Sequence, residues 1–383
     1  MKKPTVRCGA DRIPEYAELF RGKRIGLITN PSGIRSNFTS TADELFRYFT
    51  LAAMYAPEHG VRGDAQDGQT IGSYVDSATG VTVYSIYGEQ RRPAPESLES
   101  IDLMVYDIQD IGSRFYTYVY SMANCMEECA KRGIPFVVLD RPNPIGGLYP
   151  EGSGLEDAHR SFIGQYPILQ RYSLTCGELA GLFNAEYGLG VELHVVPLEG
   201  WRRDMHWGDT GLPWINPSPN IVSPEGALLY NGTALFEATN LSEGRGTTRP
   251  FEYIGAPWID PQKLADTMNA KELPGVWFRP HCFTPMFHKH KDMLCGGVQI
   301  HVTEPAGVRP WAMGLQLLLA AKEQSGEHFR FTAPRHEVGD FTADLMFGST
   351  RLREGASLSE LLDVSARSTE EFLPLWRRYQ LYD

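Results

Sequence analysis

Short apolar runs alternate with stretches of helical periodicity through the first half of the chain. Apolar runs that predict strands lie at 23–29, 51–56, 81–87, 101–106, 135–139 and 191–196. Helical periodicity is found at 41–49, 119–132 and 175–187. Because nearly continuous apolar strands that alternate with helices are typical of a parallel sheet covered on both faces, we predict an α/β fold with a Rossmann-like, doubly wound sheet.

The pattern changes near residue 224, where glycine-rich turns and mixed strands follow. A strand is predicted at 295–302, and helices are predicted at 310–324 and 368–379. The length of 383 residues also favours two domains over one. We therefore divide the chain into a Rossmann-like domain at 1–223 and a smaller α+β domain at 224–383.

Charge argues against nucleic acid as a partner. The 36 Lys and Arg residues against 47 Asp and Glu residues give a formal net charge of −11. A chain this acidic repels a phosphate backbone, and no basic stripe along the sequence compensates for that repulsion.

The sequence also predicts no membrane partner. No stretch approaches the roughly 18 apolar residues of a membrane helix. No apolar run follows Lys2 and Lys3, as a signal peptide would require. We expect a cytoplasmic protein, exported only if a leader has been removed.

Polar residues combined with glycine or proline follow four of the predicted strands. In an open parallel sheet, ligands bind beyond the carboxyl ends of the strands, so these loops are candidates for a site. Their charged and amide side chains are Asn30, Glu58, His59, Arg62, Asp107, Asp110, Arg114, Asp140, Arg141 and Asn143. For each Asp or Asn the alternative is capping of the next helix. For Arg114 and Arg141 the alternatives are an ion pair within the loops and a contact with an anionic ligand.

Glu58 is the hardest of these residues to explain as part of an ordinary linker. Pro57 restricts the backbone before it, Gly60 allows a tight turn after it, and His59 and Arg62 lie beside it. This framing favours a functional carboxylate.

Most cofactor signatures are absent from the sequence. No GxGxxG follows the first strand, and the glycine-rich segment 242–248 lacks the GK[ST] ending of a P-loop. The segment 151–154 places a serine between glycines but does not follow a strand, so it is not a nucleophile elbow. We predict no cofactor and no resident metal, with a metal-dependent hydrolase that uses Asp107, Asp110 and Asp140 as an alternative.

Aromatic residues accompany the carboxylates, amides and arginines of the loops. They are Tyr116, Tyr118, Tyr149, Trp214 and Tyr253. Carboxylates perform acid–base chemistry, amides and arginines bind hydroxyls and acids, and aromatic faces stack on sugar rings. The combination suits carbohydrate chemistry better than phosphoryl or hydride transfer.

Five long motifs carry a resemblance to a known family. They are APEHGVRG at 56–63, YDIQDIGSRFYTY at 106–118, DRPNPIGG at 140–147, PSPN at 217–220 and TNLSEGRGTT at 239–248. Together they resemble the exo-β-N-acetylmuramidase family of peptidoglycan recycling. The resemblance implies a Rossmann-like catalytic domain with a smaller domain closing the cleft. It also implies removal of N-acetylmuramic acid from the non-reducing end of peptide-free peptidoglycan fragments, with the family's catalytic glutamate matching Glu58.

Our first hypothesis is therefore a glycosidase with Glu58 as the general acid or base and Asp140 or Asp107 as the partner carboxylate. A muramyl-containing saccharide is the expected substrate. The expected substrate-binding residues are Asn30, His59, Arg62, Asp110, Arg114, Tyr116, Arg141, Asn143, Asn220, Asn240, Glu243 and Arg245. The alternative is a non-catalytic muramyl-sugar-binding protein.

Muramic acid differs from glucosamine by a lactyl ether that bears a carboxylate. A cation at the site must offset the repulsion between this anionic sugar and an acidic protein. The candidates in the motif loops are Arg62, Arg114, Arg141 and Arg245.

Overall fold

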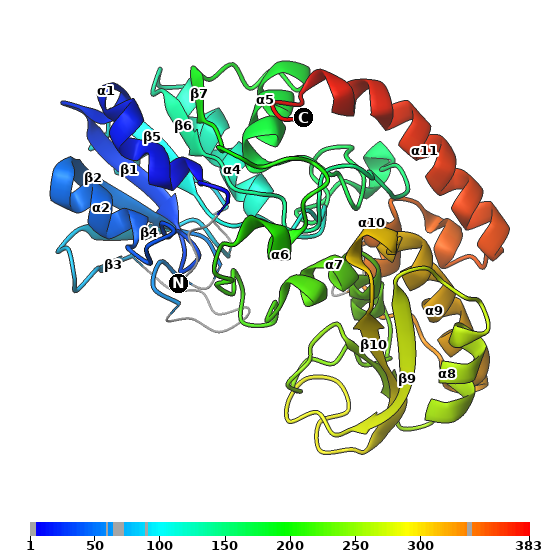
Figure 1. Ribbon diagram of the computed structural model, residues 1–383. Helices are drawn as coiled ribbons and strands as arrows, with labels where there is room; N and C mark the ends of the chain where they lie inside the picture. The colour runs from blue at the N-terminus through cyan, green and yellow to red at the C-terminus, as the bar shows by residue number, and fades with distance from the viewer. Residues whose placement is uncertain (1–4, 59, 64–72, 89–90, 335–338) are drawn as a thin grey trace.

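The structure is a computed structural model that describes residues 5–58, 60–63, 73–88, 91–334 and 339–383. It has a larger lobe around one sheet and a smaller lobe around a second sheet (Figure 1). Within the described ranges, no helix is both long enough and apolar enough to span a bilayer.

The larger lobe contains a sheet with the strand order β3-β4-β2-β1-β5-β6-β7. All neighbouring pairs are parallel except β3–β4. Its strands are β1 (Arg24–Thr29), β2 (Thr50–Ala56), β3 (Tyr74–Val75), β4 (Thr82–Ser85), β5 (Leu103–Asp107), β6 (Phe136–Leu139) and β7 (Leu193–Val196). Each strand predicted for this half is present, and the predicted fold class is confirmed.

Helices cover both faces of this sheet because successive side chains of a strand point to opposite faces. Leu27 of β1 packs in a cluster with Ile13, Phe20 and Leu45, whereas Ile28 packs in a cluster with Val119. The helices of the first face are η1 (Gly9–Tyr16), α1 (Ala17–Phe20) and α2 (Thr41–Tyr48). Those of the second face are α4 (Tyr118–Ala130) and α5 (Cys176–Glu186). Short helices also lie at α3 (Pro95–Leu98), η2 (Asp157–His159) and α6 (Trp207–Thr210).

The smaller lobe contains an antiparallel sheet with the order β8-β10-β9. Its strands are β8 (Tyr253–Ala256), β9 (Val276–Phe283) and β10 (Cys295–Val302). Its helices are α7 (Pro224–Thr233), η3 (Ala234–Ala238), α8 (Pro261–Asn269), α9 (Pro310–Ser325) and α10 (Thr342–Phe347). A Cβ on Gly232 of α7 would lie 1.9 Å from the Pro310 carbonyl oxygen, so the absence of a side chain allows α7 and α9 to pack closely.

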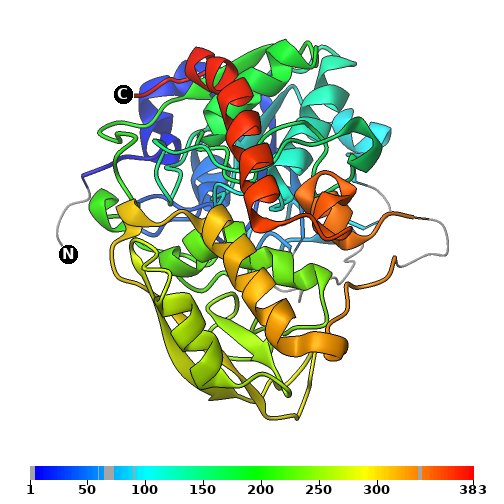
Figure 2. The same cartoon turned by 90° about the vertical axis from the view of Figure 1, so that its right-hand side faces the viewer.

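The last helix, α11 (Leu358–Arg378), leads the chain back to the larger lobe (Figures 1 and 2). It begins ten residues before the predicted start, where Ser357 and Glu360 form a capping box. Trp376 donates from Nε1 to the Ser173 carbonyl (3.0 Å). Residues 224–383, which the sequence assigns to one domain, therefore include a segment that packs on the Rossmann-like domain.

Candidate active site

A cavity of about 440 Å³ lies between the strand ends of the larger lobe and the loops of the smaller lobe. The larger lobe contributes the segments after β2 and β4 and the start of α4. The smaller lobe contributes α7, η3 and two loops. The lining residues are Glu58, Tyr87, Phe115, Tyr116, Thr117, Tyr118, Ser218, Asn220, Ile221, Tyr230, Glu237, Arg245, Phe251, Phe287 and His288.

Glu58 reaches this cavity from the loop that follows β2. Its Oε1 accepts a hydrogen bond from the Tyr87 hydroxyl (2.7 Å). The Tyr118 hydroxyl contacts the Glu58 carbonyl oxygen (3.4 Å) and donates to the Pro217 carbonyl (2.8 Å). Gly60 has a φ of 75°, a left-handed conformation that glycine adopts without steric cost. One tyrosine that follows β4 and one at the start of α4 thus hold the side chain and the backbone of Glu58.

Two further carboxylates share one arginine on the side of the smaller lobe. Arg245 donates to Glu237 Oε1 from Nε (3.2 Å) and Nη2 (2.9 Å), and its Nε lies 3.6 Å from Glu243 Oε1. Glu243 is fully buried and also pairs with Lys289 Nζ (2.8 Å) and His288 Nδ1 (3.1 Å). Glu237 is 27% exposed and lines the cavity.

The pKa values of these two carboxyl groups move in opposite directions. Burial would raise the pKa of Glu243, but the His288 hydrogen bond and the Lys289 charge outweigh it and hold the pKa at about 2. Burial raises the pKa of Glu237 despite the Arg245 charge, and the neighbouring Glu243 charge raises it further. Glu237, which lines the cavity with its pKa raised, is therefore the one of the two that suits acid–base chemistry.

Aromatic rings form a large part of the cavity wall. The Tyr116 ring packs edge-on against Tyr118 (4.8 Å between centroids) and Tyr230 (6.2 Å). Tyr230 packs edge-on against Phe251 (4.6 Å), whose ring lies 5.3 Å from the Arg245 guanidinium carbon. This wall offers apolar area beside charged groups, as a sugar-binding site requires.

The cavity brings together four of the predicted catalytic and substrate-binding residues, namely Glu58, Tyr116, Asn220 and Arg245, and the aromatic Tyr118. Of the four arginines considered for the lactyl carboxylate, Arg245 is the one that lines this cavity in the described part of the chain. The remaining predicted residues lie in the surrounding structure.

Asp107 and Arg141 form a buried ion pair at the edge of the sheet. Arg141 donates from Nε to Asp107 Oδ1 (2.6 Å) and from Nη2 to Asp107 Oδ2 (2.9 Å). Thr41 donates to the same Oδ2 (2.5 Å). Asp107 is 0% and Arg141 5% exposed. In this structure the two side chains therefore face each other and not the cavity with Glu58.

Asp140 is the second expected partner of Glu58, and it is also fully buried. Its Oδ2 accepts hydrogen bonds from the Thr175 hydroxyl (2.7 Å) and the Tyr382 hydroxyl (2.5 Å), and its Oδ1 accepts from the Gly177 amide (2.9 Å). Burial raises the pKa of this carboxyl group. Asp140 therefore fastens α5 and the C-terminal segment to β6 instead of facing the cavity.

Asp110 and Arg114 are buried in the loop after β5. Asp110 Oδ2 accepts hydrogen bonds from the Tyr172 hydroxyl and the Gly112 amide (2.7 Å), and burial raises its pKa to about 7. Arg114 is fully buried and donates to backbone carbonyls, including that of Met346 (2.7 Å) on α10. Its burial lowers its pKa to about 10. Arg114 thus joins the two lobes and does not line the cavity with Glu58.

Two predicted amides hold loops together. The Asn30 side chain accepts from the Ser32 amide (2.9 Å) and donates to the Pro217 carbonyl (2.9 Å), which ties the loop after β1 to the loop that carries Asn220. Asn143 donates to the Leu174 carbonyl (2.9 Å). In the described structure, both side chains hold neighbouring loops in place.

Three other predictions fall outside the cavity wall or outside the described residues. Arg62 pairs with Asp76 (3.0 Å) beside β4. Asn240 accepts from the Arg330 amide (2.9 Å). His59 lies outside the described residues.

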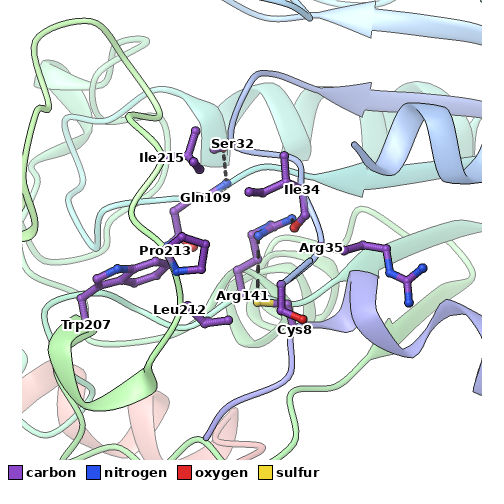
Figure 3. Close-up of a pocket in the computed structure, with 11 residues that line it drawn as sticks. Cys8, Ser32, Ile34, Arg35, Gln109, Arg141, Trp207, Leu212, Pro213 and Ile215 are labelled. Atoms are coloured by element: carbon purple, nitrogen blue, oxygen red, sulfur yellow. Dashed lines mark hydrogen bonds between the residues drawn. The ribbon is translucent and has the colours of Figure 1, made fainter. Parts of the chain in front are cut away.

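The crevice between β1 and β5, where the strand order reverses, is nearly filled. A cavity of about 20 Å³ remains there, which is room for about one water molecule. Arg141 lines it beside Cys8, and Trp207, Leu212 and Pro213 also line it (Figure 3). The usual binding place of a Rossmann-like sheet is thus closed, and the larger cavity lies instead beyond β2.

The sequence reasoning missed Tyr87, Glu237 and His288. The sequence pattern places Tyr87 at the end of a predicted strand, whereas in the structure it follows β4 and donates a hydrogen bond to Glu58. Glu237 lies in η3, just before the motif at 239–248. Its position beside that motif is the feature of the sequence that could have identified Glu237 as a site residue. Among the residues that the structure describes, no group of three or more His, Cys, Asp or Glu side chains could hold a metal ion.

Comparison with known proteins gives matches along nearly the whole chain. Residues 25–225 match the family model "Exo-beta-N-acetylmuramidase NamZ, N-terminal", and residues 228–382 match the corresponding C-terminal model. The peptidoglycan beta-N-acetylmuramidase NamZ of Bacillus subtilis (strain 168) is 44% identical over 388 aligned residues, which cover 100% of this chain and 92% of that protein. Two solved DUF1343 family proteins from Bacteroides fragilis NCTC 9343 are 37% and 29% identical, with TM-scores of 0.90 and 0.80. They match over 100% and 99%, respectively, of both chains compared.

Proposed function

The chain belongs to the exo-beta-N-acetylmuramidase NamZ family, and we propose that it releases N-acetylmuramic acid from the non-reducing end of peptide-free peptidoglycan fragments. The observation that carries this proposal is the similarity to the Bacillus subtilis enzyme over the whole chain. The position of Glu58 in a cavity with a second carboxylate supports it. A role in cell-wall recycling belongs to the same proposal, and a cytoplasmic location stays a prediction of the sequence.

Glu58 is the proposed general acid or base on the glycosidic bond. Hydrolysis requires protonation of the leaving oxygen while positive charge develops on the sugar ring. The hydrogen bond from Tyr87 fixes the orientation of the carboxyl group, which lowers the entropic cost of reaching a reactive geometry.

Glu237 is the proposed second carboxylate of the pair. It replaces Asp107 and Asp140 in this role because it lines the cavity that contains Glu58. Its raised pKa, with burial as the main cause, keeps a proton available for acid–base exchange.

Arg245 is the proposed partner of the lactyl carboxylate. Its guanidinium lies in the cavity wall, and the planar fork of arginine matches a carboxylate in two parallel hydrogen bonds. Arg245 would then bind the lactyl carboxylate of the sugar and the Glu237 carboxyl group at the same time.

The test is the release of free N-acetylmuramic acid from a muramyl-glucosamine disaccharide. Loss of a general acid–base group costs about 10²–10⁴-fold in rate, so Glu58→Gln and Glu237→Gln should each lower kcat by about that factor. Glu99→Gln, which removes an exposed carboxylate outside the cavity, is the matched control. Its rate should equal that of the wild type.

Three results would contradict the proposal. Disaccharide binding in a calorimeter without any turnover by the wild type would indicate a binding protein instead of an enzyme. Wild-type kcat in Glu58→Gln would remove that residue from the reaction. A changed KM with unchanged kcat in Glu237→Gln would make it a positioning residue for Arg245.

A further inference from the structure

A second, open groove of about 530 Å³ lies on the larger lobe, and none of the residues that line it belongs to the active-site cavity. It is formed by the segment before α3, one side of α4 and the loop that follows η2. The lining residues are Arg91, Arg92, Asn124, Glu127, Arg160, Ser161, Phe162, Gln165 and Tyr166.

The groove is positively charged although the protein is acidic. It contains three arginines and one glutamate, whereas the chain has a net charge of −11. Arg92 is paired with Glu127 and lies 3.5 Å from Glu128, and Arg160 pairs with Asp157 (2.7 Å) on the surface. Among the residues described, Arg91 has no carboxylate partner. A local excess of positive charge on an acidic surface attracts anions.

The geometry around Arg91 suits recognition of a carboxylate. Its guanidinium carbon lies 4.3 Å from the centre of the Phe162 ring, and this stacking covers the flat face of the cation. The edge of the guanidinium, which carries the N–H donors, is left to form hydrogen bonds. Asn124 donates to the Arg91 carbonyl (3.0 Å) and accepts from Gln165 (3.0 Å), so the backbone below the cation is fixed.

Helix α4 connects this groove to the active site. Thr117, at the start of α4, lines the cavity, and Asn124 lines the groove. The two residues are seven positions apart, so they lie on the same side of the helix at a spacing of about 10 Å. A short chain of sugar rings can span this distance.

We propose that this groove binds the lactyl carboxylate of a second muramyl residue farther along the glycan chain. The inference rests on the proposed function, because glycans of peptidoglycan alternate glucosamine and muramic acid. The first muramyl residue occupies the cavity with Glu58, and the next negative charge lies two rings away. Phe162, which is partly exposed, provides apolar area for the sugar that carries it. The groove thus makes longer fragments better substrates than the disaccharide.

The experiment compares two substrates with the purified enzyme. One is the muramyl-glucosamine disaccharide, and the other is the tetrasaccharide that repeats this unit. The variants are Arg91→Met, Arg160→Met and the double variant, with Arg21→Met as the matched control because Arg21 is an exposed arginine that follows α1, outside the groove. Thermal melting checks that each variant is folded.

The wild type should have a lower KM for the tetrasaccharide than for the disaccharide. Exposed charge pairs contribute modestly, so the double variant should raise the tetrasaccharide KM by about three- to tenfold at low salt. The double variant should keep the wild-type kcat for the tetrasaccharide and the wild-type kcat and KM for the disaccharide. The control Arg21→Met should keep the wild-type kcat and KM for both substrates. Arg91→Lys keeps the charge but loses the fork and should give an intermediate KM.

The outcomes separate this inference from the proposed function. If the wild type hydrolyses both substrates and the double variant has wild-type constants for both, the groove does not bind the glycan. An equal rise of KM for both substrates also overturns the inference, because the effect would then act through the cavity. If the wild type hydrolyses neither substrate, the proposed function fails, and the groove proposal fails with it.

Discussion

Replacing Arg141 with methionine should destabilise the larger lobe while leaving the chemistry intact. The substitution removes both hydrogen bonds to Asp107 and the one to the Ile34 carbonyl (2.7 Å). It leaves the Asp107 carboxylate, which is 0% exposed, without its cation. Breaking a buried ion pair by removing one partner costs about 3–5 kcal/mol. Asp107→Asn should cost a similar amount, because it leaves Arg141 buried with no opposite charge.

Urea unfolding measured by tryptophan fluorescence can detect this effect. With an m value of about 3 kcal/mol/M, the loss corresponds to a midpoint lowered by about 1–2 M. The double variant Asp107→Asn/Arg141→Met removes both charges of this pair and leaves neither partner buried alone, so it should lose less stability than the two single variants added together. The kcat for the disaccharide, measured on folded protein at 25 °C, should remain close to that of the wild type in all three.

One pattern would refute the reasoning. If Asp107→Asn keeps the wild-type urea midpoint but loses kcat, Asp107 acts in the reaction, and the ion pair is not its main role. Additive losses in the double variant would show that the two groups do not stabilise each other.

Two other predictions follow from buried or cavity-lining charges. Because Asp110 has a folded-state pKa of about 7 and an unfolded value of about 3.9, the folded state holds the proton more tightly. As the pH rises from about 4 to about 7, the free energy of unfolding of the wild type should therefore fall relative to that of Asp110→Asn, by at most about 1.4 kcal/mol per pH unit. Urea midpoints of both proteins at about pH 4.5 and about pH 7.5 measure this difference. A wild-type midpoint that rises relative to the Asp110→Asn midpoint as the pH rises would contradict the prediction. Arg245→Met should raise KM for muramyl substrates by about ten- to hundredfold and hardly affect a glucosamine-terminated analogue. Equal weakening of both sugars would assign Arg245 a structural role.

The first sheet could be predicted because its strands are short, buried on both faces and therefore continuously apolar. The smaller lobe was harder. Strand β9 (Val276–Phe283) alternates buried and exposed residues only over its first half, and Pro280 within it weakens the strand signal. The early start of α11 was signalled by Ser357 and Glu360, which form a capping box ahead of a weakly apolar stretch.

The position of the site could be predicted only in part. Residues that follow parallel strands do gather at one edge of the sheet, as the prediction for Glu58 and Asp107 assumed. Strand order, however, does not determine which way a side chain turns. Asp107 turns into the protein to meet Arg141, whereas Glu58 lines the cavity. Glu237 comes from the other lobe, and its approach to Glu58 depends on how the lobes pack, which no local pattern encodes.

The larger lobe is built from two parts of the chain that the smaller lobe separates. The Tyr382 hydroxyl bonds to Asp140, and Trp376 bonds to the Ser173 carbonyl, across more than two hundred residues in each case. During synthesis on the ribosome, β1 to β7 emerge first, and the whole smaller lobe follows before these partners are made. The nascent larger lobe therefore exposes the surface under α11 until translation has passed both lobes. Maturation of the two lobes is coupled in time, and the isolated segment 1–223 is expected to be a poor target for expression.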